Sequence, residues 1–253
     1  VDVFAINQNE VCAEGEIGTL KRVIECAKTT LLVLTPWHDP GVIRRVWCLA
    51  ETMWTLQLEG TGCVLRVALC TKEKQSLLAA LRSEHPEGLT AASVLESIFQ
   101  IDAAKAEATQ KRDADMIFGW IEEQVEGGVH ELNMRVKDGL RAALKQAVRA
   151  EAEAPGNQAD DKLMIGAGRY FSDMGDNFDG ALEYYGRALR IKEQAHGKVH
   201  ISSAATLNDM GRVCRRKGDY DGALEYYGRA LRIIEQAHGE DDSRSAITRT
   251  SLG

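Results

Sequence analysis

The chain has 253 residues, of which 44% are hydrophobic, so it can form one large or two modest domains with a buried core. Its formal net charge of -7 at pH 7 argues against nucleic-acid binding, because binding to a duplex depends on Lys and Arg side chains that neutralise phosphates. No apolar run in the sequence approaches the roughly 18 residues of a membrane span, so we expect no membrane partner.

Six cysteines are scattered along the sequence without a CxxC pair or the spacing of His/Cys metal ligands. This distribution disfavours a zinc site and a disulfide framework, and it indicates a reducing, cytoplasmic setting. We therefore expect no metal and no resident cofactor.

The first 70 residues alternate short apolar runs with helical patterns. Nearly continuous apolar runs, typical of strands that are covered on both faces, lie at 1–7, 29–35 and 63–70. Helical periodicity between them covers 17–28 and 42–58. This alternation predicts a three-stranded parallel sheet and an α/β fold for the N-terminal part.

Polar and aromatic side chains follow these runs, at the edge of a parallel sheet where ligands bind. Asn7 follows the first run, and Trp37 follows the second. No run is followed by a GxxxxGK[ST] or GxGxxG motif, which argues against a P-loop NTPase and an ordinary dinucleotide oxidoreductase.

A more specific pattern lies at 31–52, where LLVLTPW is followed by a polar loop and RVWCLAET. It resembles the Toll/interleukin-receptor (TIR) domain, in which a hydrophobic strand precedes a helix that opens on Trp-Cys-x-x-Glu. The run DVFAINQ at 2–8 likewise resembles TIR-related and fungal heterokaryon-incompatibility (HET) domains. The resemblance covers about residues 1–70. It implies a flavodoxin-like fold, incomplete because the family's first strand has no counterpart, and a module for signalling-type self-association.

In enzymatically active TIR relatives, the Glu that matches Glu51 cleaves the nicotinamide–ribose bond of NAD. The resemblance therefore implies an alternative function, an NAD glycohydrolase with Glu51 as the catalytic carboxylate and a ligand crevice lined by Asn7, Trp37 and Trp47. A carboxylate there would stabilise oxocarbenium-like charge on the ribose, and Trp37 could stack on a base or the nicotinamide. The competing interpretation makes Glu51 a solvated carboxylate in the first turn of a helix, and Trp47 and Trp54 core residues.

Beyond residue 72 the pattern is helical as far as about residue 154. The helical segments lie at 72–82, 90–99, 103–126 and 129–152. The stretch at 152–159, which contains Pro and Gly, is the best candidate for a linker. We therefore expect an α/β domain with a helical extension at 1–151, a linker at 152–159 and a second domain at 160–253.

The second domain contains an internal repeat. FDGALEYYGRALRIKEQAHG at 178–197 recurs as YDGALEYYGRALRIIEQAHG at 220–239, an offset of 42 residues. The two copies differ only at Phe178/Tyr220 and Lys192/Ile234. The same offset places AITRTSLG at 246–253 under AATLNDMG at 204–211, so we expect two complete copies and a truncated third, in a fragment of a longer protein.

Each copy has the pattern of a helix pair. In the second copy, the buried stripes of the two helices are expected at Leu207, Met210, Gly211, Cys214, Ala223, Tyr227 and Ala230. Gly218 would end the first helix and Asp221 would cap the second, while Asn177 is an extra residue in the first copy. Because a single pair cannot bury its apolar face, the pairs should stack into a solenoid.

This arrangement resembles the tetratricopeptide repeat. The longer period, with TLNDMG, RRKGDYDGALEYYGRALRI and AHGED, resembles the repeats of kinesin light chains. The resemblance covers about residues 160–253 and implies an all-α solenoid that holds a protein or peptide; the alternative is a spacer without a ligand. In the register of the family, the concave groove is lined by Arg169, Asn208, Arg212, Arg215 and Arg216.

These groove residues would form a basic channel that suits an extended peptide with Asp, Glu or a C-terminal carboxylate. An interpretation of equal weight is that the arginines pair with carboxylates of the repeats, such as Glu183 and Glu225. Two functions from different classes follow for the whole chain. The first, which we expect, is an interaction protein with a TIR-like module and a peptide-binding repeat array, and the second is an NAD-cleaving enzyme controlled by the repeats.

Overall fold

The computed structural model describes residues 13–37, 41–83, 100, 102–108, 111–175, 177–238 and 250. Contacts divide the chain into two units, one with residues 1–75 and 93–147 and the other with 76–92 and 148–253. Two of the divisions fall inside helices, in α3 (Thr71–Arg82) and in α6 (Gly128–Glu153), and the third lies outside the described residues. The sequence placed the boundary at 152–159; a turn does follow α6 there, but the last residues of α6 already pack with the repeats.

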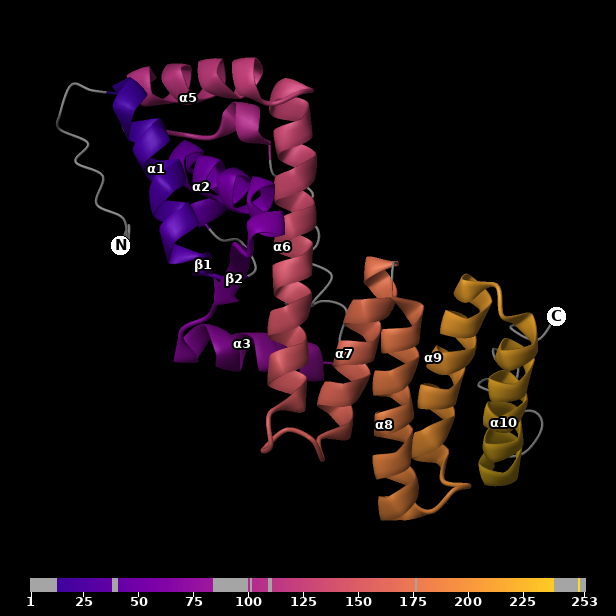
Figure 1. Ribbon diagram of the computed structural model, residues 1–253. Helices are drawn as coiled ribbons and strands as arrows, with labels where there is room; N and C mark the ends of the chain where they lie inside the picture. The colour runs from indigo at the N-terminus through magenta and orange to yellow at the C-terminus, as the bar shows by residue number, and fades with distance from the viewer. Residues whose placement is uncertain are drawn as a thin grey trace. The chain divides into compact units, whose positions relative to one another are not determined.

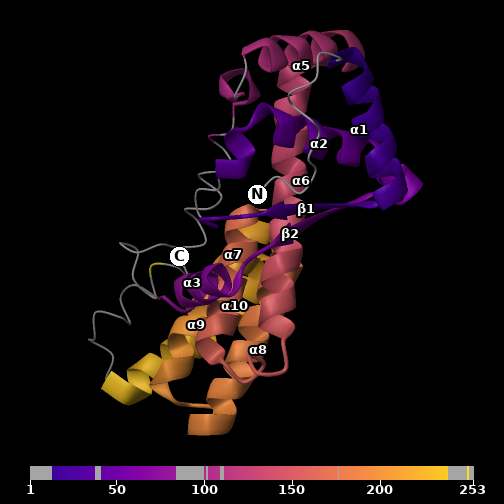
Figure 2. The same ribbon diagram turned by 90° about the vertical axis from the view of Figure 1, so that its left-hand side faces the viewer.

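The first unit contains a small parallel sheet, whose strands lie side by side in Figure 1 and Figure 2. β1 (Thr29–Val33) pairs with β2 (Val64–Ala68) in a register that joins Thr29 to Val64. Two of the predicted strands are thus confirmed with shorter bounds. The predicted strand at 1–7 lies outside the described residues, and the TIR-like, flavodoxin-like fold stays a prediction.

One face of this sheet is covered by helices. α1 (Ala13–Ala27) precedes β1, and α2 (Val46–Gln57) connects the strands and packs against both of them. Thr30 and Leu32 of β1 are buried on that side, where the hydroxyl groups of Thr30 and Thr55 share a hydrogen bond. Leu31 and Val33 alternate with them and are exposed on the other side.

The helical extension is confirmed in part. α3, α5 (Lys111–Gln124) and α6 lie where helices were predicted, whereas the predicted helix at 90–99 lies outside the described residues. The helix expected from residue 103 begins only at Lys111, and Ala103–Lys105 forms a single 3₁₀ turn, η3. Glu107 explains the late start, because its N–H donates to Arg44 O and its carbonyl accepts from Val46 N, 2.8 and 3.1 Å away. Two more 3₁₀ turns are η1 (Gly41–Arg44) and η2 (Glu59–Thr61).

The second unit contains consecutive helices that stack in sequence order (Figure 1). They are α7 (Asp161–Met174), α8 (Phe178–His196), α9 (Ile201–Lys217) and α10 (Tyr220–His238). Each packs against the next one along the chain, and short turns make neighbours antiparallel. The pairs α7/α8 and α9/α10 are the two predicted repeats, and no described residue after 160 lies in a strand.

The same close contact marks both repeats. A Cβ atom on Gly168 of α7 would lie 3.0 Å from the ring of Tyr185 in α8, and one on Gly211 of α9 would lie 2.7 Å from the ring of Tyr227 in α10. A side chain at either glycine would force the tyrosine ring to shift from its packed position. The residues predicted to form the buried stripes are all buried.

The helix ends correct two details of the repeat. Gly175 and Gly218 end α7 and α9 in the left-handed conformation, with φ of 77° and 86°, as predicted for Gly218. The cap of α10 is Asp219 and not Asp221, because Oδ1 of Asp219 accepts the amide three residues on at 2.9 Å. Asn177 caps α8 in the same way at 3.0 Å. Asn177 therefore corresponds to Asp219, and the extra residue of the first copy is the one before it.

Polar contacts join the first repeat to the second. Nζ of Lys192 in α8 donates to the carbonyl of Ser202 at 3.0 Å and to Oγ1 of Thr206 at 3.2 Å, both in α9. Arg229 of α10 pairs with Glu193 of α8 at 3.1 Å. Lys192 is one of the two positions at which the copies differ, so the difference has a structural role at this junction.

Two further features of the described residues are the state of the cysteines and the hydropathy of the helices. Every cysteine in the part of the chain that the structure describes is a free thiol, with Cys26 and Cys70 exposed. None of the helices within the described ranges is both long enough and apolar enough to cross a bilayer.

Candidate peptide-binding groove

The exposed side of α9 carries four of the five predicted groove residues. Arg212, Arg215 and Arg216 are exposed and Asn208 is half-buried, at intervals of three or four residues that place them on one side of the helix. The opposite side of α9 packs into the repeat core. We call Asn208, Arg212, Arg215 and Arg216 the α9 stripe.

Arg212 pairs with an acid of its own helix. Its Nη2 lies 2.8 Å from Oδ1 of Asp209, with 52% of the Arg212 side chain but only 17% of the Asp209 side chain exposed. Burial raises the pKa of Asp209, and the positive charges of Arg212, Arg169 and Lys192 oppose that rise. The carboxylate of Asp209 therefore partly compensates the positive charge of Arg212.

Arg216 joins the two repeats. Its Nη1 donates to Oγ of Ser172 at 2.9 Å and lies 3.9 Å from Oδ1 of Asp173, both in α7. Its guanidinium also lies over the ring of Phe178, 5.3 Å from the centroid. Burial raises the pKa of Asp173, an effect that Arg216, Arg212 and Arg169 counteract. These contacts give Arg216 a role in repeat stacking.

Arg215 is the groove arginine whose charge is most available. It is exposed, and within the described ranges no ion pair or hydrogen bond engages its guanidinium. The carboxylates expected as alternative partners, Glu183 and Glu225, form no ion pair with the groove arginines in those same ranges. The acids that do pair with them are Asp209 and Asp173.

Arg169 lies on α7 at the position equivalent to Arg212, since each directly follows one of the glycines that contact a tyrosine. Its Nη1 donates to the main-chain carbonyl of Ser83, just beyond α3, at 3.3 Å. The segment around Ser83 therefore covers part of the α7 surface that corresponds to the α9 stripe.

The predicted crevice at the carboxyl ends of the strands depended on an open face of Trp37. Trp37 follows β1 and is 0% exposed, and its main-chain N–H donates to Oε2 of Glu73 at 3.0 Å. Trp37 therefore offers no open face for a nicotinamide or base, which corrects the expectation; Asn7 lies outside the described residues. Sequence reasoning missed Glu73, although an acid in the first turn of a helix that follows a strand was a visible signal.

The remaining crevice candidates lie on α2. Trp47 and Glu51 are half-buried one turn apart, and Nε1 of Trp47 donates to Oδ2 of Asp113 in α5 at 3.3 Å. Glu51 lies in the second turn of α2, so its interpretation as a first-turn carboxylate is wrong. Trp54 is a core residue, as predicted, and its ring lies 4.5 Å from that of Trp120.

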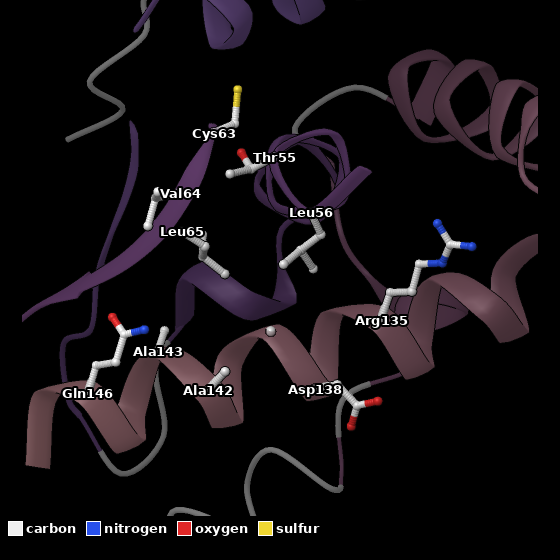
Figure 3. A pocket seen from close by; sticks show the side chains of 11 residues that line it. Thr55, Leu56, Cys63, Val64, Leu65, Arg135, Asp138, Ala142, Ala143 and Gln146 are labelled. Carbon is white, nitrogen blue, oxygen red and sulfur yellow. The ribbon is translucent and has the colours of Figure 1, made fainter. Parts of the chain in front are cut away.

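A cavity of about 430 Å³ in the first unit was not predicted. It lies between α2, β2 and α6, and Figure 3 shows Leu56, Leu65 and Ala143 facing it while Cys63 and Asp138 point away. Its lining therefore combines aliphatic side chains with polar ones, among them Arg135 and Gln146. Among the residues that the structure describes, no group of three His, Cys, Asp or Glu could hold a metal ion.

Stacked helix pairs with a polar stripe along a first helix define the class, a helical-repeat solenoid of the kind that binds peptides and protein segments. The family model of the tetratricopeptide repeat matches residues 165–236 and 202–253. The C-terminal part of the chain therefore contains tetratricopeptide repeats, which supports an interaction or scaffold role. A search of curated proteins found no match to the chain.

Proposed function

We propose that this chain is a scaffold protein whose repeats bind an extended acidic peptide, or a C-terminal carboxylate, along the α9 stripe. The observation that carries the proposal is the exposed guanidinium of Arg215, available beside Arg212 on one helix face. Guanidinium groups bind carboxylates through two parallel hydrogen bonds, which gives both strength and orientation. The 42-residue offset of the copies supports repeats of the kinesin-light-chain type.

A titration of the full chain with labelled acidic peptides tests this proposal. Fluorescence anisotropy would compare an Asp/Glu-rich peptide carrying a free C-terminus with its amidated form. The double variant Arg212→Glu/Arg215→Glu should bind at least about tenfold more weakly, since each substitution replaces an attraction by a repulsion. The dependence of binding on salt should also become smaller.

The matched control is Arg190→Glu/Arg232→Glu, which makes the same change of charge at exposed positions on α8 and α10. If both double variants weaken binding equally, the effect comes from net charge and the groove assignment fails. If the unaltered chain binds none of the peptides, the repeats are a spacer.

We propose a finer role for the first unit, self-association as a TIR-like module. The exposed face of the sheet supports it, because Leu31, Val33 and Val64 are 54%, 46% and 38% exposed there. We do not extend the proposal to NAD cleavage, since Trp37, the stacking platform for that reaction, is buried.

A further inference from the structure

The end of α3 packs with the repeats, far from them in the sequence. Leu77, Ala80 and Leu81 are 1%, 7% and 2% exposed. Nε of Arg82 lies 2.7 Å from Oδ2 of Asp160, the residue whose side chain also caps α7. We call residues 76–83 the α3 end.

The α3 end approaches α7 at backbone distance. A Cβ atom on Gly166 would collide with the main-chain carbonyl of Leu81, so only glycine fits at this position. Helices that approach so closely pack backbone against backbone and leave no room for water. Together with the buried Leu77 and Leu81, this contact is typical of a permanent core interface.

The covered part of α7 includes the counterpart of Arg212 in the α9 stripe. Gly168 and Gly211 are equivalent, so Gly166 and Arg169 of α7 correspond to Asp209 and Arg212 of α9. Gly166 contacts Leu81, and Arg169 donates to the carbonyl of Ser83. The α3 end thus lies where the groove would continue from α9 onto α7.

We propose that the α3 end is the N-terminal cap of the repeat solenoid and that it closes the peptide groove at α7. Solenoids need such caps, because a terminal repeat otherwise leaves one apolar face without a neighbour. The partner surface then begins at α9, with Arg212 and Arg215, and Arg169 is a structural residue. The position of the groove rests on the proposed function, whereas the cap does not.

Gly166→Ala in the full chain tests the cap. We expect the amides of 77–83 to exchange with solvent at least about tenfold faster and the second unit to unfold at a lower temperature. The control is Gly186→Ala in α8, where no atom lies closer than 3.8 Å to the new Cβ and exchange should not change. If the Gly166→Ala variant does not fold, Arg82→Glu takes its place in the test. That substitution replaces the ion pair with Asp160 by a repulsion between two carboxylates and adds no atoms to α7. Unchanged exchange and unfolding in both variants would overturn the cap.

The same acidic peptide tests the closed groove. Arg212→Gln should weaken binding severalfold and Arg169→Gln by less than about twofold, and saturating peptide should leave exchange at 77–83 unchanged. Equal losses in the two variants, or faster exchange at 77–83 on binding, would show that the groove extends over α7. If the unaltered chain binds no peptide, the proposed function fails, while the Gly166→Ala comparison still decides whether the α3 end is the cap.

Discussion

Asp209 lies beneath the groove arginines and sets how much positive charge they present. Its carboxylate is mostly buried and forms an ion pair with Arg212, and the positive charges of Arg169 and Lys192 also act on it. Burial raises its pKa, so the ionised form costs free energy in the folded chain. The α9 stripe is therefore a basic surface that an internal acid moderates.

Asp209→Asn should strengthen the binding of an acidic peptide by about two- to fivefold. The amide keeps the size of the side chain and removes the charge that compensates Arg212, at a pair of the kind that contributes up to about 1 kcal/mol. Anisotropy titration measures the change. Asp221→Asn, an exposed acid in the first turn of α10, is the control and should leave the affinity unchanged.

The same substitution should alter the pH dependence of stability. Because the folded pKa of Asp209 is raised, its contribution to stability is fully present below the unfolded pKa and is lost as pH rises through the folded pKa. Asp209→Asn should remove that loss, so unfolding by urea at a series of pH values should show a flatter profile in this range. A profile identical to that of the unaltered chain would mean that Asp209 does not titrate differently on folding.

At the scale of the element, α9 has an unusual N-cap. His200 has the extended backbone of a cap residue, with φ -87° and ψ 138°, and its Nδ1 accepts the N–H of Ser202 at 3.2 Å. Its ring stacks on His196 at the end of α8, with 4.7 Å between the centroids. An imidazole serves here where Asp, Asn, Ser or Thr is the usual cap.

His200→Asp should stabilise the second unit by about 0.5–1 kcal/mol. A carboxylate is the stronger acceptor at an N-cap and also interacts favourably with the positive end of the helix. Thermal unfolding measures the gain, expected as a rise of roughly 1–4 °C for a chain of this size. Val199→Asp adds the same charge one residue earlier without the capping bond, and a gain as large in that variant would attribute the effect to charge alone.

The repeat elements could be predicted because their determinants are local. Gly211 and Tyr227 recur with the period of the copies, and the periodicity placed the buried stripes and the end of α9 at Gly218. The cap of α10 was misplaced by two residues, since Asp219 and Asp221 both have side chains that can cap and only the backbone path selects between them.

The candidate sites were less predictable because their determinants are non-local. The contact between Gly166 and Leu81 joins segments that share no periodic pattern, so nothing in the sequence placed the α3 end on α7. The hydrogen bond from Trp37 to Glu73 likewise joins the turn after β1 to the first turn of α3, two segments that share no local pattern. The candidate groove on α9 could be placed because one helix carries most of it. Whether the predicted crevice is open depends instead on the burial of Trp37, which the sequence does not determine locally.

At the scale of the whole molecule, a negative net charge surrounds a local basic stripe. The formal charge of -7 repels a second copy of the chain, while the α9 stripe attracts acidic groups at short range. Salt screens exposed charges beyond about 10 Å. Added salt should therefore weaken peptide binding and favour self-association, so the two proposed activities are expected to respond to salt in opposite directions.

Self-association through the sheet face should be weak and should increase with salt. The exposed side chains of Leu31, Val33 and Val64 form a small apolar area, far below that of a stable interface, so we expect dimers only at roughly 100 µM protein or above. Sedimentation equilibrium at low and high salt measures the association. Leu31→Thr/Val33→Thr should reduce the association severalfold, because threonine keeps the β-strand preference and removes apolar surface.

The control variant Val199→Thr/Leu224→Gln removes exposed apolar side chains from the second unit and should leave the association unchanged. A monomer at every concentration and salt level would remove the sheet face as an association surface, and equal losses in both double variants would attribute association to general hydrophobic contact.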